Sequence, residues 1–499
     1  MSSRLENTSE ASKEFAVYLE RVCGQIRWKK AHSSIRRELC SHMEDQMAEY
    51  VSAGIPPEEA ARKAVQEMGD PVEVGTKLDR SYRPKMDKGL LLAAGLLLAA
   101  GWLLYLFFAR SSILIMSWMN LLIATVLGIG AMLAAVKADY TIFAMGRRTG
   151  LMVYVLYNAV IFILPIFYRY DHGGFRYLLF SAAVHLFLLF PLVLCGVMYS
   201  FRNQGFSGFL LCGAMAAVSL FLMLLGRASG GLLVLIPSLA VMAMALKMDW
   251  FGPFSRGKRA AAYTCMFVPL GIFLLLILAN RGGQQLISII LNPSIDDHSE
   301  GYIYIVIRSI LKSSHWIGPV DSVATPWGNF PMEELLRWNP DLLITWTIGR
   351  LGWWTLCVII PLALMICLKG IQICLRQSGQ LGKMVSCAVV VTLAAQFLCF
   401  LQANLGLVYM IPYPFPFLQG NRSIIVNLFL LGFLLSVGQR KGLDEPAPPR
   451  GGDESLGIKQ PAALSVRRSG REIDISLKLR LPEWKQHGPE EKQVPFKPD

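Results

Sequence analysis

Ionisable side chains are rare inside the long apolar runs of this sequence, so those at the borders of the runs are candidates for chemistry. Most of them lie in one stretch: Asp296, Asp297, His298, Glu300, Arg308, Lys312, His315, Asp321, Glu333, Glu334, Arg337 and Asp341. Asp341 stands apart, because it follows Asn339-Pro340 and immediately precedes the apolar run Leu342-Leu343-Ile344. A carboxylate there lies near the positive end of a helix dipole and can exchange protons. The alternative role is a structural N-cap of that helix.

Other chemistry-bearing residues have plainer explanations. His185 lies within an apolar run, where a lone histidine favours a hydrogen-bonded contact between helices. Glu38, His42, Asp45 and Glu49 share one helix face, which is either a metal site or, as we expect, a solvated face. Most of the ten cysteines fall inside apolar runs and act as small hydrophobic residues. Since the cysteines and histidines show no zinc spacing, we predict no metal site.

The composition excludes a soluble enzyme. Of the 499 residues, 54% are hydrophobic and 17% are charged, with a mean hydropathy of +0.45. A soluble protein of this length carries about 25% charged residues. The net charge of +13 does not indicate nucleic-acid binding, because much of it lies between apolar runs.

About ten apolar runs are long enough to cross a bilayer, which needs about 20 residues each. They lie near 89–109, 113–136, 149–168, 177–199, 207–225, 229–246, 259–279, 342–368, 384–406 and 423–438. The runs 207–225 and 229–246 are separated by only three residues, so a single re-entrant pair is the alternative there. The pattern predicts an all-α membrane protein.

Positive charge between the runs sets the orientation. The basic residues of alternate gaps are Lys137, Arg147, Arg148, Arg202, Lys247, Arg256, Lys258, Arg259, Lys369, Arg376, Lys383, Arg440 and Lys441. All of these gaps fall on the same side, which we assign to the cytoplasm, so both termini are predicted to be cytoplasmic. Residues 280–341 then form one large outside loop, which we expect to be ordered on the membrane surface because it contains several tryptophans.

The two ends of the chain are polar. Residues 1–86 are predicted to form a small cytoplasmic helical domain, with an apolar stripe through Ile35, Leu39, Met43, Met47 and Tyr50. The membrane domain is predicted to span residues 87–441. Residues 442–499 combine prolines, glycines and charges of both signs, which predicts a disordered cytoplasmic tail. Within it, 472–481 alternates weakly, so a strand formed on a partner is the alternative there.

Several short motifs follow one another in the second half of the chain. They are Leu291-Asn292-Pro293-Ser294-Ile295-Asp296 with Gly301-Tyr302, Ser313-Ser314-His315-Trp316-Ile317-Gly318, Asp341-Leu342-Leu343-Ile344 with Leu351-Gly352, Gln402-Ala403-Asn404-Leu405-Gly406, and Pro414-Phe415-Pro416-Phe417 with Ser423, Asn427-Leu428 and Leu431-Gly432. Gly173-Gly174-Phe175-Arg176-Tyr177 precedes them. In order and spacing they resemble the LNPxxDPxGxGY, SGGLxG, DFIFAxxGEELG, NxG, PLPFxSYGGSS and GxxRW motifs of the FtsW/RodA/SpoVE (SEDS) family. Residues 1–86 resemble the prefix domain found before some bacterial permeases.

The resemblance implies a polytopic glycosyltransferase of the bacterial plasma membrane. Such proteins polymerise a polyprenyl-diphosphate-linked disaccharide, the peptidoglycan precursor, at the outer face, usually with a class B penicillin-binding protein. They serve cell division, elongation or sporulation. The family's essential aspartate falls on Asp341, which would act as general base. Cations that would bind the diphosphate or the sugar are Arg176, Arg308, Lys312, His315 and Arg422, with Arg337 as a further candidate. No cofactor is expected beyond an optional divalent cation.

The chain also departs from the family pattern. The paired glutamates of GEELG are replaced by Gly349-Arg350, and SYGG by Gln419-Gly420-Asn421-Arg422. Two alternatives to an enzyme therefore stay open: a membrane scaffold or regulator of wall synthesis that has lost the chemistry, and a lipid or solute transporter. The prefix domain favours the scaffold, whereas the scarcity of intramembrane charge argues against ion-coupled transport.

Overall fold

The computed structural model describes residues 2–82, 86–110, 118–170, 185–225, 230–279, 281–296, 300–338, 340–407, 416–418, 420–439, 464–469 and 472–477. Most of these residues are helical, which confirms the predicted all-α class. The strands among them form two antiparallel hairpins, β1–β2 and β3–β4.

The N-terminal segment folds as a small helical unit with a core of its own. Its elements are α1 (Ser2–Gln25), η1 (Lys29–Ala31), α2 (His32–Ser52), α3 (Pro57–Glu67) and α4 (Pro71–Tyr82). The predicted apolar stripe is buried at Ile35, Leu39 and Met43, which pack with Val22 of α1 and Ala64 of α3. This cluster is separate from the core of the membrane helices. Because the stripe packs inward, the polar residues of α2 face solvent.

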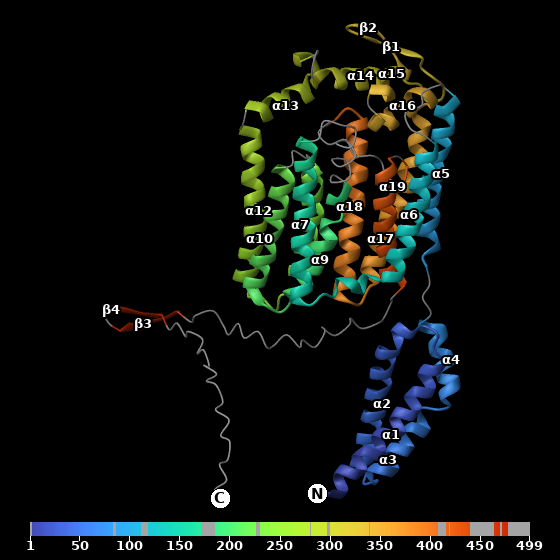
Figure 1. Cartoon of the computed structure of the whole chain (residues 1–499), viewed down its shortest axis with the longest axis vertical. Helices are drawn as coiled ribbons and strands as arrows, with labels where there is room; N and C mark the ends of the chain where they lie inside the picture. The colour runs from blue at the N-terminus through green and yellow to red at the C-terminus, as the bar shows by residue number, and fades with distance from the viewer. Residues whose placement is uncertain are drawn as a thin grey trace, which may run out of the picture. The chain divides into compact units, whose positions relative to one another are not determined.

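The membrane domain is a bundle of long apolar helices (Figure 1). They are α5 (Lys88–Arg110), α6 (Trp118–Ala138), α7 (Arg147–Tyr170), α9 (Phe190–Ser200), α10 (Gly205–Leu225), α11 (Gly230–Lys247), α12 (Arg256–Ala279), α17 (Leu356–Arg376), α18 (Gln380–Asn404) and α19 (Asn421–Gln439). Among the described residues, six segments are long and apolar enough to cross a membrane: Lys88–Phe107, Trp118–Ala138, Gly205–Met223, Trp353–Arg376, Gln380–Asn404 and Arg422–Gln439. The shorter apolar helices His185–Ser200 and Leu233–Lys247, with α7 and α12, occupy the four other predicted runs. The chain is a multi-pass membrane protein.

Close backbone approach holds the central helices together. A Cβ atom on Gly432 of α19 would lie 2.5 Å from the carbonyl oxygen of Met132 on α6, so only glycine fits there. Small residues allow this kind of contact in lipid, where dispersion rather than water release drives helix association. Helix α18 is the most enclosed of the six spanning segments, and it carries the polar residues that reach the site described below.

The basic gaps between helices meet at one end of the bundle. Tyr140, after α6, receives a hydrogen bond from Gln377, after α17, and its own backbone N–H donates to Ser436 near the end of α19. Gln380 bonds to the carbonyl of Met248, and Trp250 bonds to that of Met198. These contacts place the Lys- and Arg-rich gaps together, as the charge pattern predicts.

The opposite end, which we call the outer end, is covered by the segment predicted as the large outside loop (Figure 1). Its elements are α13 (Arg281–Leu291), η3 (Pro293–Asp296), α14 (Glu300–Ser313), β1 (Ser322–Thr325), β2 (Gly328–Pro331), α15 (Met332–Trp338), η4 (Pro340–Leu342), α16 (Leu343–Leu351) and η5 (Trp353–Thr355). Strands β1 and β2 pair from Ser322↔Pro331 to Thr325↔Gly328. The prediction that this segment is ordered is confirmed for its described residues.

The prediction of one spanning helix over 342–368 is wrong. The run divides into α16 and α17, separated by Gly352, whose φ of 106° lies in the left-handed region that favours glycine. The chain at the break pairs instead with the segment after α14: Gly318 N–H donates to Leu351 O, and Trp353 N–H donates to His315 O. Hydropathy alone does not detect this break, because the residues on both sides of Gly352 are apolar.

The C-terminal tail, predicted as disordered, contains a hairpin. Strands β3 (Leu464–Ser469) and β4 (Glu472–Leu477) pair in antiparallel register, with Val466 opposite Ile475 and Arg467 opposite Asp474. These twelve residues lie within the segment 442–499, for which a disordered tail, or a strand over 472–481 formed on a partner, stays a prediction. The rest of 442–499 lies outside the described residues.

Candidate functional site

Asp341 lies in the short helix η4, between α15 and α16 in the segment that covers the outer end of the bundle. It does not cap α16: the N-cap position is Leu342, whose side chain makes no capping hydrogen bond, and the Thr345 N–H in the first turn donates to Asn404 instead. Among the residues that the structure describes, the Asp341 carboxylate makes no hydrogen bond or ion pair. The structural N-cap interpretation is therefore wrong, and the carboxylate is free to meet a ligand.

The backbone around Asp341 is held by one buried amide. Asn404, the last residue of α18, donates from Nδ2 to the carbonyl oxygen of Asp341 over 3.0 Å. Its Oδ1 accepts from the backbone N–H of Thr345, also over 3.0 Å. The Thr345 hydroxyl lies 2.7 Å from the backbone oxygen of Asn404. A spanning helix thus fixes both η4 and the first turn of α16.

Burial changes the acid strength of Asp341. The side chain is largely enclosed although not sealed from solvent, and this desolvation raises its pKa from 3.8 to about 6. Desolvation penalises the charged form of a carboxyl group, because a low-dielectric surrounding does not replace lost hydration. A pKa near 6 suits a general base at neutral pH, since the carboxylate still predominates while its proton affinity is higher than that of an exposed aspartate.

Arg350 at the end of α16 is paired with two acids of the outer segment. Its Nη1 lies 2.5 Å from Asp321 Oδ1 and its Nη2 lies 3.1 Å from Glu333 Oε1. The Arg350 side chain is largely buried, with 16% exposed, whereas both acids are more open. A buried guanidinium needs such partners. The acids lie just before β1 and in α15, so the pair ties the hairpin region to the end of α16.

Arg308, predicted to bind the diphosphate or the sugar, is engaged by the backbone. Its guanidinium donates to the carbonyl oxygens of Gly406, at 3.2 Å from Nη2, and of Ile290, at 2.5 Å. It therefore ties α14 to the ends of α13 and α18. A substrate role for Arg308 stays a prediction. In that role Arg308 would use the guanidinium N–H groups that do not bond to these two carbonyl oxygens.

The other predicted cations are spread over the outer end. Lys312 in the last turn of α14 and His315 just after it are exposed, and Arg422 is partly exposed in the first turn of α19. Arg176 lies outside the described residues, and so does the side chain of Arg337. The structure brings Asp341, Arg308 and the 402–406 segment together through Asn404 and Gly406, whereas within the described part of the chain no hydrogen bond or ion pair joins Asp341 to Lys312, His315 or Arg422.

A second buried polar group lies between α18 and α19. Gln396 and Asn427 form a two-way amide pair, with distances of 2.9 Å and 3.1 Å, and Asn427 also donates to Ser423. All three side chains are buried. In an apolar bundle such a pair is stable because each donor and acceptor finds a partner. It locks α18 against α19, next to the helix end that carries Asn404.

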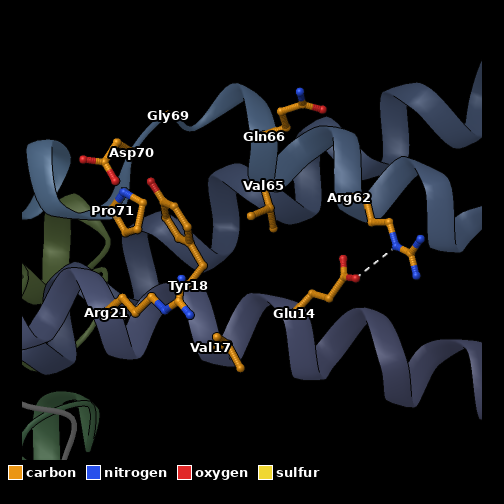
Figure 2. Close-up of a pocket in the computed structure, with 10 residues that line it drawn as sticks. All are labelled: Glu14, Val17, Tyr18, Arg21, Arg62, Val65, Gln66, Gly69, Asp70 and Pro71. Carbon is orange, nitrogen blue, oxygen red and sulfur yellow. Dashed lines mark hydrogen bonds and ion pairs between the residues drawn. The ribbon is translucent and has the colours of Figure 1, made fainter.

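The N-terminal unit shows no arrangement that favours catalysis. Among the described residues, no group of three or more His, Cys, Asp or Glu side chains could hold a metal ion. Glu38, one of the four residues of the predicted polar face, accepts a hydrogen bond from Tyr82. A groove of about 620 Å³ lies between α1 and the α3–α4 region, where Tyr18 sits between Arg21 and Asp70 (Figure 2). Its lining mixes both charges, including an ion pair between Glu14 and Arg62.

Asn404 was not predicted as a site residue, although it lies in the motif Gln402-Ala403-Asn404-Leu405-Gly406. The available signal was a lone asparagine at the end of a long apolar helix, eight residues after another buried amide. A polar residue in such a place needs a partner. The partners are about 60 positions away in sequence, so spacing along the chain does not reveal them.

Comparison with known proteins gives distant structural likenesses. No model of a protein family matches the sequence, and no curated protein matches it. One similar solved chain is described as "Structural coordination of polymerization and crosslinking by a peptidoglycan synthase complex"; it is 18% identical, covers 71% of this chain and 97% of that one, and has a TM-score of 0.48. Another is a crystal structure of a mutant of the rod shape determining protein RodA of Thermus thermophilus, 14% identical over 72% of this chain and 99% of that one, with a TM-score of 0.43.

Proposed function

We propose that this chain is a membrane glycosyltransferase that extends glycan chains from a polyprenyl-diphosphate-linked disaccharide at the outer face of the bacterial plasma membrane. The observation that carries the proposal is Asp341: a carboxylate without a side-chain partner among the described residues, held at the outer end of the bundle by a buried amide. The motif resemblance supports the substrate class. A class B penicillin-binding protein is the partner that this activity would need for crosslinking.

The proposed reaction forms one bond and breaks one. The acceptor sugar hydroxyl attacks the anomeric carbon of the donor, and a new glycosidic C–O bond forms. The bond from that carbon to the diphosphate oxygen breaks, and polyprenyl diphosphate leaves with the electron pair. Asp341 takes the hydroxyl proton as general base. With a pKa of about 6, its carboxylate form outnumbers the acid by about ten to one at pH 7.

The leaving diphosphate carries negative charge, so cations near it lower the barrier. Lys312 is exposed and Arg422 is partly exposed at the outer end, and neither forms an ion pair with a described residue, so both are available to a bound phosphate. Arg308 keeps the Gly406 and Ile290 carbonyls as partners, so its role would be to shape the site as well as to contact phosphate.

Polymerisation by the purified protein tests the proposal. We expect Asp341→Asn to lower the rate of glycan formation from the lipid-linked disaccharide by roughly 10²- to 10⁴-fold, the usual contribution of a general base. The matched control is Glu334→Gln, which neutralises an acid of α15 that lies near Asp341 in sequence and has no assigned role. Equal rates for Asp341→Asn and the parent protein would refute the catalytic assignment, and failure of the parent to make glycan would favour the scaffold.

A further inference from the structure

Both the nitrogen and the oxygen of the Asn404 side-chain amide are hydrogen-bonded at the outer end of α18. It is fully buried, and Nδ2 donates to Asp341 O and to Phe400 O, both over 3.0 Å. Oδ1 accepts from the Thr345 N–H over 3.0 Å and lies 3.2 Å from the Thr345 hydroxyl. An amide provides two donors and one acceptor oxygen on one planar group, and no other side chain of this size does so.

We propose that Asn404 is a positioning residue that holds Asp341 in its enclosed, catalytically competent place; this inference rests on the proposed function. The Asn404 amide hydrogen-bonds to the backbone at two points, the carbonyl oxygen of Asp341 and the N–H of Thr345, so it fixes the η4–α16 junction. Without the amide, the Asp341 carbonyl loses its donor and the junction is free to swing toward water. The carboxylate would then lose the geometry that proton transfer requires.

Among the described side chains of the neighbouring elements, no charged group pairs with the Asp341 carboxylate. Helix α15 carries Glu333, Glu334 and Arg337; Glu333 is paired with Arg350 of α16, and the side chain of Arg337 lies outside the described residues. Helix α18 has no charged residue between Met384 and Asn404. Among the described side chains, Asn404 supplies the hydrogen bond that joins a spanning helix to the backbone of Asp341.

Two readouts on the full-length protein test the inference. Dicyclohexylcarbodiimide modifies protonated carboxyl groups in apolar surroundings, so mass spectrometry of Asp341 labelling against pH reports its protonation without any need for activity. Polymerisation of the lipid-linked disaccharide gives kcat and KM. For the parent we expect a labelling midpoint near pH 6, in line with the raised pKa of the buried side chain.

Asn404→Ala is expected to lower the labelling midpoint by about one pH unit or more, as Asp341 becomes hydrated. It is also expected to lower kcat at least tenfold while KM changes less than threefold. Thr345→Val removes the hydroxyl contacts and should give a smaller shift in the same direction, whereas Thr345→Ser keeps the hydroxyl and should restore parent values. Gln396→Ala is the matched control: it removes a buried amide from the same helix, bonded to Asn427 rather than to the η4–α16 junction.

The outcomes separate the two claims. Should the parent make no glycan while Asn404→Ala still shifts the midpoint and Gln396→Ala does not, the positioning role stands and the proposed function fails. Parent-like labelling and kcat in folded Asn404→Ala overturn the positioning role, and so does an equal midpoint shift in Gln396→Ala. If Asn404→Ala does not fold, the Thr345→Val and Thr345→Ser pair decides: a shift in the first that is absent from the second supports the role, and identical midpoints overturn it.

Discussion

Replacing Asp341 by asparagine is expected to stabilise the protein near neutral pH while removing its activity. The folded pKa of Asp341 lies above its ordinary value, so the folded protein binds more protons than the unfolded chain between pH 3.8 and about 6. The free energy of unfolding therefore falls as pH rises through this window and stays lower above it. Asparagine carries no charge and has nearly the same shape, so it avoids this cost.

The size of the effect follows from the pKa shift. A change from 3.8 to about 6 corresponds to roughly 3 kcal/mol as an upper bound. Because the side chain keeps some contact with solvent, we expect Asp341→Asn to gain about 1–2 kcal/mol at pH 7.5. At pH 4.5, which still lies above the unfolded pKa of 3.8, the gain should fall to about a third of this value, and it should vanish only below pH 3.8.

Thermal unfolding of the purified protein in detergent measures this gain. Both proteins are heated at one scan rate at pH 7.5 and pH 4.5, because irreversible unfolding makes the apparent Tm depend on rate. We expect Asp341→Asn to raise the Tm more at pH 7.5 than at pH 4.5, with Glu334→Gln as the control. A lower Tm for Asp341→Asn at pH 7.5 would show that the carboxylate is stabilised in the fold, contrary to our account of its burial.

Three further predictions concern other parts of the molecule. The rate of glycan formation should fall about tenfold per pH unit below pH 6 and level off above pH 7, because the base acts unprotonated; a rate that rises toward acid pH would exclude Asp341 as the base. Gln396→Leu should cost about 1–3 kcal/mol of unfolding free energy by orphaning Asn427, and the added change Asn427→Leu should recover most of it, as thermal shifts of both variants would report. Gly352→Ala should destabilise the protein by about 1–3 kcal/mol, because φ is 106° and the new Cβ would meet the Trp316 carbonyl; Gly130→Ala, which meets nothing within 4 Å, should leave the Tm unchanged.

The fold was predictable where hydropathy is decisive and not where contacts between distant segments decide it. The apolar runs locate the bundle helices, and the charge pattern groups the basic gaps at one end. The break at Gly352 was not predictable, because the residues from Gly349 to Trp354 form backbone hydrogen bonds with the segment His315–Val320, which lies far from them in sequence. Asp341 was recognisable from its position between a proline and an apolar run, but the hydrogen bond from Asn404 to its backbone was not.

Arg308 and Arg350 show the same limit for charged residues. From sequence, Arg308 is a free positive charge on the predicted outside loop, and Arg350 is one within the predicted apolar run 342–368. In the structure, Arg308 is bound to carbonyls of Ile290 and Gly406, and Arg350 to two acids. Sequence gives the formal charge, whereas the charge that a ligand meets depends on partners that only the fold supplies.

The grouping of Arg350 with Asp321 and Glu333 has a consequence for how substrates approach. Together the three side chains carry one net negative charge. This group therefore repels a phosphate at long range, although it contains an arginine. Long-range capture of an anionic headgroup would fall to the cations elsewhere on the outer end. The dependence of association rate on ionic strength would then report Lys312 and Arg422, and be insensitive to residue 350.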